Sequence, residues 1–346
     1  MVEKKLRQTG NISPGRDWRG TKTVAEPFIQ HSTVKAFAEE KVNLPSETAK
    51  KYRAQVNALR ERLEAHIAAN PGFALVKMLH AGSVAKGTAL RTINDLDVAV
   101  YVKKEEVPVS DQDLVPWLAD RLREANPNMN PDQFDDSQPN CVTVKFRGSG
   151  LDVDVVPVLY EGDERDFGYL ISSDTGNRIL TSIPLHLEFI RTRKKAHPNH
   201  FAQVVRLVKW WASQQKTRNS FFKCKSFMIE LIVAYLADRG LNSSDYPNAL
   251  EALFSYIVKT RLQERIAFTD YYAASDLPHS DGAPIEIFDP VNPSNNVASR
   301  YTTTDLTSLV DAAEEAGDAV SEAHYATTKA RAVECWRIVL GQSFRG

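Results

Sequence analysis

Two aspartates separated by one residue, Asp95 and Asp97, begin an apolar run that continues through Val98, Ala99 and Val100. Strand side chains alternate between two faces, so both carboxylates project from one face, with Cα atoms ~6.5–7 Å apart. Neighbouring carboxylates repel each other unless a cation lies between them, and they are costly in a buried strand. Their oxygens suit Mg²⁺ or Mn²⁺, and phosphoryl transfer uses two such ions ~3.5–4 Å apart. An isolated pair of this kind is usually a solvated strand start, but the buried strand here favours a metal-dependent centre.

A glycine and a serine, Gly82 and Ser83, stand upstream of this pair, between a predicted strand and a short helical turn. Glycine lets the backbone approach a phosphate closely, and amides at a helix N-terminus favour the anion. Ser83 adds a hydroxyl donor, although a Gly-Ser turn alone is equally typical of an ordinary helix N-cap. With Gly87 and Thr88 between this turn and the aspartates, the spacing favours a phosphate-binding loop.

A third carboxylate is expected from a neighbouring strand. Residues 151–157 carry Asp152 and Asp154, again on one face of a predicted strand. One of the two would bridge the metal ions, and the other would be an outer ligand or a solvated charge. Periodicity alone does not choose between them.

The elements that must hold these groups follow from hydrophobic periodicity. Apolar patterns predict a long helix over 45–69 and a buried strand over 73–79. Further strands are predicted over 95–102, 142–146 and 151–156, and the turn 148–150 predicts that the last two form an antiparallel hairpin. Further helices are predicted over 112–125, 201–213, 226–239 and 306–340. The polar residues 1–30 contain Gly and Pro and are interpreted as an extended or partly ordered arm.

The order of these elements predicts an α+β protein of two lobes. A mixed α/β lobe is expected over 1–190 and a helical lobe over 191–346, with a cleft between them. The last helix is expected to end near Leu340, with Gly341 as its left-handed closing residue. The small and polar residues that follow predict a flexible C-terminal tail.

Composition restricts the class of partner and the compartment. The formal net charge of -1 and the pI near 6.7 supply no global field that would gather nucleic acid, so small nucleotides fit better than polymers. The three cysteines are scattered and form no CxxC pair, which favours a reducing cytosol. No signal peptide is recognisable, and the longest apolar stretch, 228–237, is too short to cross a bilayer. We therefore expect a cytoplasmic protein without a membrane partner.

The order G-S-x(3)-G-T, D-x-D and a later D-V-V-P resembles the nucleotidyltransferase superfamily of oligoadenylate synthases, cyclic GMP-AMP synthase and poly(A) polymerase-like enzymes. The resemblance implies a polymerase β-like core with a long N-terminal spine helix. It implies Asp154 as the third catalytic aspartate, because that residue directly precedes the apolar pair and the proline. Segments 207–211 and 225–231 look like the helices that supply Lys209 and Ser226 to the triphosphate. Segment 288–297 is similar to a cleft segment, which implies nucleotide contacts for Asp289 and Asn296.

Within that superfamily the chain resembles bacterial CD-NTases, which make cyclic di- or trinucleotide signals in anti-phage (CBASS) defence. The resemblance implies condensation of NTPs, ATP and/or GTP, with release of pyrophosphate and with two Mg²⁺ ions, Mn²⁺ being an alternative. Some CD-NTases are joined through their C-terminus to other molecules by a ubiquitin-like conjugation enzyme. The terminal Gly346 suits that chemistry, although a tail ending in glycine is common by chance.

Several alternatives stay open at this level. Three other enzyme classes use the same carboxylates: a template-independent RNA polymerase of the CCA-adding or poly(A) type, a dsRNA-activated synthase and an antibiotic nucleotidyltransferase. The last alternative is a non-catalytic binding protein. Both polymer-binding classes need a basic surface that the net charge does not indicate. His197 and His200 lack a cysteine cluster, so no zinc site is predicted. The basic run 191–195 is interpreted as a solvated charge run at a lobe junction.

Overall fold

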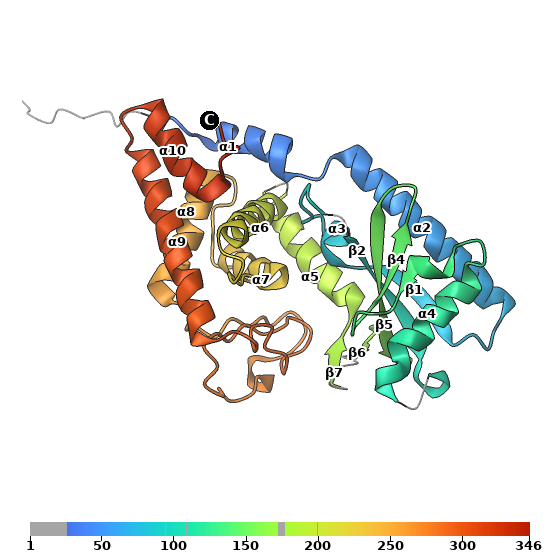
Figure 1. The fold of residues 1–346 in the computed structure, drawn as a ribbon. Helices are drawn as coiled ribbons and strands as arrows, with labels where there is room; N and C mark the ends of the chain where they lie inside the picture. Colours follow the sequence, from blue (N-terminus) through green and yellow to red (C-terminus); the bar gives the residue numbers. More distant parts are fainter. Residues whose placement is uncertain (1–25, 94, 108–109, 172–176, 199) are drawn as a thin grey trace, which may run out of the picture.

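The computed structural model describes residues 26–93, 95–107, 110–171, 177–198 and 200–346, and most of the arm expected over 1–30 lies outside this part. Figure 1 shows a lobe built on a β-sheet beside a lobe built of helices, with the N-terminal helices running across both. The α+β prediction is confirmed.

The first lobe is organised by a seven-stranded mixed sheet of order β1-β2-β5-β4-β3, with β6 pairing β5 and β7. The strands are β1 (Leu75–His80), β2 (Asp95–Lys103), β3 (Phe134–Asp135), β4 (Val142–Phe146), β5 (Leu151–Tyr160), β6 (Gly168–Ile171) and β7 (Arg178–Thr181). Strands β2 and β5 run parallel, whereas the other pairs are antiparallel. The two strands with the D-x-D patterns are therefore direct neighbours.

One face of this sheet forms the core of the lobe. Helices α2 (Ser46–Ala69) and α4 (Leu114–Ala125) cover that face, packing against valines of β2 and β5 such as Val98 and Val153. Burial alternates along the first part of β5, with valines inward and aspartates half-buried. Strand alternation thus directs the aspartates to the opposite face. On that side, the short helix α3 (Gly82–Lys86) connects β1 to the segment that leads into β2.

The second lobe is a bundle of helices with its own hydrophobic core. Its helices are α5 (Ile183–Ala196), α6 (Phe201–Arg218), α7 (Ser226–Ala237), α8 (Tyr246–Thr260), α9 (Thr303–His324) and α10 (Lys329–Leu340). The N-terminal α1 (His31–Phe37) and the π-helical η1 (Ala38–Val42) contribute to the same core. Short 3-10 turns lie at Lys104–Glu106, Asp111–Asp113, Pro131–Gln133 and Ala274–Asp276. The division proposed at residue 190 falls inside α5 and stays a prediction.

The last predicted helix, 306–340, is two helices in the structure. Thr302 caps α9, and Thr328 caps α10 by accepting a hydrogen bond from the amide of Arg331. A threonine N-cap satisfies amides that a helix start leaves unpaired, so Thr328 starts a new helix where periodicity alone suggested continuity. Within the described residues, no helix combines the length and apolarity that crossing a membrane requires.

The C-terminal residues differ from the flexible tail expected from the sequence. Gly341 ends α10 as expected and has a positive φ of +86°, but its ψ of 171° lies outside the left-handed helical conformation that was predicted. Phe344 is 1% exposed and packs edge-on against Phe37, with ring centroids 5.2 Å apart. The Nε of Arg337 also donates to the carbonyl of Phe344 over 3.1 Å. A buried aromatic ring outweighs the small and polar residues around it, so the segment is docked on α1 and α10.

Candidate nucleotidyltransferase site

The parallel pairing of β2 and β5 brings the two D-x-D patterns together. In this register Asp97 lies opposite Asp154, and the backbone of Asp95 lies opposite that of Asp152. Asp97, Asp152 and Asp154 are half-buried, whereas the intervening Val153 is fully buried in the core. The side chain of Asp95 lies outside the described part of the structure. Carboxylates predicted from two distant segments thus share one face of the sheet.

The glycine of the predicted phosphate loop lies directly against Asp97. Gly82 has φ +63°, a conformation that L side chains rarely adopt, and a Cβ atom added there would overlap the Oδ2 of Asp97. The amide of Ala81 donates to the backbone carbonyl of Asp97 over 2.9 Å, which fixes the loop to β2. Only glycine therefore lets the loop and the carboxylate approach each other this closely.

Strand β4 and the residue before it supply neighbours of Asp154 that periodicity did not single out. The hydroxyl of Thr143 donates to Oδ1 of Asp154 over 2.6 Å. Burial, together with the charges of Asp154 and Asp97, raises the pKa of the Cys141 thiol to about 11. The thiol therefore stays neutral at physiological pH beside the carboxylates.

We expect Asp154→Ala to be inactive and Asp152→Ala to be only impaired. Asp154 pairs in register with Asp97, which lines the cavity described below, whereas Asp152 lies opposite Lys145 on β4. The measurement is the rate of nucleotide incorporation for both purified variants. The reverse order of activities would show that the third ligand is assigned to the wrong aspartate.

A cavity of about 360 Å³ opens between the loop after β1 and the helices α6 and α7. Its lining residues are Gly82, Ser83, Lys86, Thr88, Leu90, Ile93, Asp97, Lys209, Ser226, Phe227 and Glu230. The structure thus brings Gly82, Ser83, Asp97, Lys209 and Ser226 together from four predicted segments. Backbone amides, hydroxyls and ammonium groups beside a carboxylate form a lining that suits a triphosphate.

A buried carboxylate organises the cationic part of this cavity. Glu230 is 2% exposed and lies 2.6 Å from the Nζ of Lys209 and 2.9 Å from that of Lys86. Thr88 donates to the same carboxylate over 2.7 Å. Burial by itself would raise the pKa of Glu230, but the two lysines outweigh it and hold the pKa at about 2. The network therefore holds two ammonium groups and one carboxylate in fixed positions.

Sequence reasoning missed Lys86 and Glu230 as site residues. Lys86 lies inside the G-S-x(3)-G-T pattern, at a position the pattern leaves unspecified, and its Nζ lies 4.7 Å from the ring centroid of Phe227. Glu230 is the acidic residue that interrupts the apolar stretch 228–237. An ionised residue in an otherwise apolar helix was the available signal, because such a residue needs a buried partner.

Ser226→Ala and Lys209→Ala are expected to differ in their effect on stability. Ser226 is exposed at the first position of α7, so its loss should weaken ATP binding roughly tenfold with little change in melting temperature. Lys209 is buried against Glu230, so its loss should weaken binding and also destabilise the fold by on the order of 3 kcal/mol. Calorimetry with ATP and thermal unfolding separate the two effects. Unchanged ATP affinity in both variants would show that neither residue binds the triphosphate and that their roles are structural.

Asp289 and Asn296 lie outside the lining of this cavity. Asp289 is 3% exposed and accepts from the Nε2 of His186 over 2.7 Å and from the amide of Val291 over 2.9 Å. The side chain of Asn296 bonds the backbone of Ile287 and neighbouring residues. Both side chains therefore hold the loop over 285–298 in shape, and a direct role in nucleotide binding stays a prediction.

The carboxylates on the sheet face opposite α2 and α4 fit a divalent cation. Asp97 and Asp154 offer the hard oxygen ligands that Mg²⁺ and Mn²⁺ prefer, on strands held in register. Among the described side chains, no three His, Cys, Asp or Glu residues come together as a metal-binding group. The side chain of Asp95, the third member of the predicted set, lies outside the described part of the structure.

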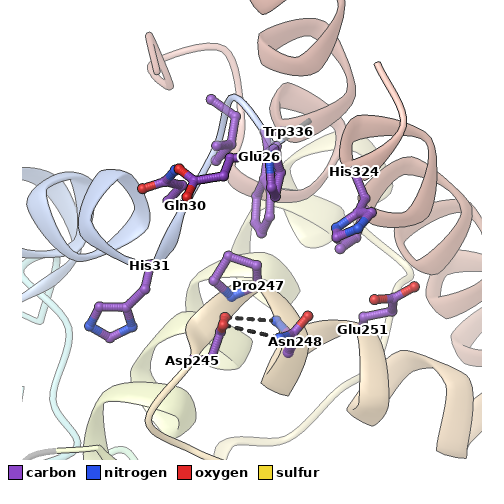
Figure 2. Close-up of a pocket in the computed structure, with 12 residues that line it drawn as sticks. Glu26, Gln30, His31, Asp245, Pro247, Asn248, Glu251, His324 and Trp336 are labelled. Carbon is purple, nitrogen blue, oxygen red and sulfur yellow. Dashed lines mark hydrogen bonds between the residues drawn. The ribbon is translucent and has the colours of Figure 1, made fainter. Parts of the chain in front are cut away.

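A second cavity, of about 350 Å³, lies on the helical lobe between the N-terminal segment and helices α8, α9 and α10. Figure 2 shows its polar lining, with Glu26, Asp245 and Glu251 around it and two hydrogen bonds from Asn248 to Asp245. None of its described lining residues is lysine or arginine. A lining rich in carboxylates repels a triphosphate, so this cavity is not a candidate for the nucleotide.

The mixed sheet, the paired aspartates and the glycine loop define a nucleotidyltransferase. Comparisons with known proteins agree with this class. The family model of the Second Messenger Oligonucleotide or Dinucleotide Synthetase domain matches residues 29–184. The family model of domain 2, the C-terminus, of 2'-5'-oligoadenylate synthetase 1 matches residues 174–340.

A cyclic AMP-AMP-AMP synthase of Escherichia coli (strain MS 115-1) is 51% identical over 318 residues, covering 92% of this chain and 98% of that protein. The structure of E. coli MS115-1 CdnC with ATP has a TM-score of 0.88 at 51% identity and covers 92% of this chain and 100% of that chain. E. coli MS115-1 CdnC in a complex with HORMA-deltaN has a TM-score of 0.88 at 50% identity, with coverages of 92% and 99%. The chain therefore belongs to the bacterial CBASS oligonucleotide cyclases, the family that its sequence resembles.

Proposed function

We propose that this chain condenses three molecules of ATP into a cyclic trinucleotide, with release of pyrophosphate at each step. The observation that carries the product assignment is the 51% identity to a cyclic AMP-AMP-AMP synthase, which extends over 92% of this chain. The site supports the chemistry, because a carboxylate, a glycine loop and two lysines line one cavity. ATP is the proposed substrate, in agreement with the ATP in the structure of the similar CdnC.

The proposed roles follow from the positions of the side chains. Gly82, Ser83, Lys209 and Ser226 bind the triphosphate, and their cavity borders Asp97. Asp95, Asp97 and Asp154 would hold divalent cations, which we propose to be Mg²⁺, with Mn²⁺ as a substitute. Bound ions would neutralise the triphosphate and lower the pKa of the acceptor hydroxyl.

The remaining steps are assigned to the side chains themselves. Asp154, beside the expected acceptor position, accepts the proton of the ribose hydroxyl, whose oxygen forms the new bond to the α-phosphorus. The bond from the α-phosphorus to the bridging oxygen breaks, and pyrophosphate leaves. Lys86 and Lys209, held by Glu230, stabilise the negative charge that develops on the leaving group. Ring closure repeats this displacement on the linear intermediate.

Product analysis tests this proposal. The purified protein is incubated with Mg²⁺ and either ATP alone or all four NTPs, and products are treated with phosphatase before mass spectrometry, with a separate sample digested by a single-strand nuclease. The expected product from ATP alone contains three AMP units and resists phosphatase. A linear oligoadenylate that loses its terminal phosphates, or a product that requires another base, would contradict the assignment.

The structure of the CdnC complex also suggests a protein partner. HORMA-deltaN is bound in that structure, and we propose that a HORMA-type protein binds this chain as well. Conjugation through Gly346 is not favoured, because Phe344 anchors the preceding residues between α1 and α10. We further propose that the protein acts in the cytoplasm, where nucleoside triphosphates are available and its three free cysteines stay reduced.

A further inference from the structure

Three polar side chains form a row across the open face of the sheet. Asp97 on β2 lies opposite Asp154 on β5, and Asp154 lies opposite Thr143 on β4. The Oγ1 of Thr143 donates to Oδ1 of Asp154 over 2.6 Å, at the short end of hydroxyl–carboxylate hydrogen bonds. Thr143 is only 7% exposed, so water does not readily replace it as the donor. The rotation of the Asp154 carboxylate is thus fixed by a residue of the adjacent strand.

The next row of the sheet provides an internal comparison. Asp152 lies opposite Lys145 on the same two strands, and the Nζ of Lys145 lies 2.6 Å from an oxygen of Asp135. An ammonium group near a carboxylate competes with a metal ion for the negative charge. A hydroxyl gives one hydrogen bond and leaves the full charge on the carboxylate. The two rows therefore differ: Asp154 accepts a hydrogen bond from the hydroxyl opposite it, whereas the residue opposite Asp152 is an ammonium group that pairs with Asp135 instead.

Packing alone does not account for a hydroxyl at position 143. Valine has nearly the same shape as threonine and equal suitability for a strand, and the neighbouring Val142 and Val144 are fully buried. A hydroxyl in a site this buried is costly unless it makes a hydrogen bond, and here the partner is a carboxylate. This is the geometry of a metal-binding carboxylate that is oriented by a hydrogen bond from a residue which does not itself bind the metal.

We propose that Thr143 is a positioning residue that orients Asp154 for binding the divalent cation on the acceptor side. The proposal rests on the role proposed above for Asp154. Loss of the hydroxyl should leave the triphosphate contacts intact, because Thr143 does not line the cavity that contains Gly82, Lys209 and Ser226. The expected defect is therefore in metal affinity and kcat, and not in ATP affinity.

The test compares Thr143→Val, which removes the donor at constant shape, with Thr143→Ser, which keeps it. For Thr143→Val we expect Mn²⁺ affinity and kcat to fall roughly 10–100-fold, with the KM for ATP changed less than about threefold. Mn²⁺ binding is measured without turnover, from the electron paramagnetic resonance signal of free Mn²⁺ in the presence of a non-hydrolysable ATP analogue. Thr143→Ser should restore both quantities to within about threefold of the parent protein.

The outcomes separate this inference from the proposed function. Thr143→Val with unchanged Mn²⁺ affinity and kcat, while Asp154→Ala is inactive, would overturn the role of Thr143 alone. If Asp154→Ala retained Mn²⁺ binding and turnover, the proposed role of Asp154 would be overturned, and the role of Thr143 that rests on it would be overturned as well. Equal defects in Thr143→Ser and Thr143→Val would also overturn the inference, because the hydroxyl would then not be the cause. If Thr143→Val does not fold, Thr143→Ala serves as the variant without a donor, with the same expectation.

Discussion

Replacing Asp95 and Asp97 together by asparagine is expected to reduce product formation by roughly 10³-fold or more, while the fold stays intact. Asparagine has the shape of aspartate but lacks its charge, so the variant loses cation binding with little change in packing. Relief of repulsion between Asp97 and Asp154, which are partners in the sheet, should also keep the melting temperature equal or raise it. The measurement is incorporation of radiolabelled ATP, with thermal unfolding beside it.

Asp120→Asn is the matched control for this double variant. Asp120 is 71% exposed on α4 and pairs with Arg123 on the surface, where such a pair contributes little. Its loss should leave activity unchanged. Divalent cations should raise the melting temperature of the parent protein and of the control, and fail to do so in the double variant. Near-normal turnover in the double variant would refute the metal centre.

Gly82→Ala is expected to reduce activity by roughly 10²-fold or more, although alanine adds only a methyl group. The added Cβ would overlap the Oδ2 of Asp97, so either the loop or the carboxylate must move. The left-handed backbone at this position also costs an alanine about 1–2 kcal/mol. Displacement of the phosphate loop relative to the carboxylate should impair ATP binding and kcat together.

Gly148→Ala serves as the control for this effect. Gly148 lies between β4 and β5, where an added Cβ atom would meet only open space, and it does not adopt a left-handed conformation. Activity close to that of the parent protein is therefore expected for Gly148→Ala. If Gly82→Ala were equally active, the contact between the glycine loop and Asp97 would not matter for the reaction.

The sequence was sufficient to predict the elements that hold the aspartates. Alternation of aspartates with apolar residues at the start of β2 and β5 indicated which side chains share a face, and the helix over 45–69 is α2. A neighbouring strand was expected to supply the third carboxylate, but the sequence could not predict that β5 runs parallel to β2 or in which register, because both depend on contacts between distant segments. That pairing places Asp97 beside Asp154. The pairing of β4 with β5, by contrast, was predicted from the turn between them, and it brings Thr143 to Asp154.

The charge network around Glu230 could not be predicted for the same reason. Lys86, Lys209 and Glu230 come from three different helices, α3, α6 and α7, and each alone is compatible with a solvated or snorkelling side chain. Only the packing of α6 and α7 against the loop after β1 shows that one carboxylate serves both lysines. The docked Phe344 is a further case, because its partner Phe37 is distant in the sequence.

The most direct test of the proposed site is a crystal structure with Mn²⁺ and a non-hydrolysable ATP analogue. The expected result is anomalous scattering from manganese between the carboxylates of Asp97 and Asp154, with the triphosphate on Gly82 and Ser83 in the cavity lined by Lys209 and Ser226. The proposed site would be contradicted if no manganese bound between Asp97 and Asp154 and if manganese or nucleotide bound elsewhere. One such place is the cavity of Figure 2, beside Asp245 and Glu251.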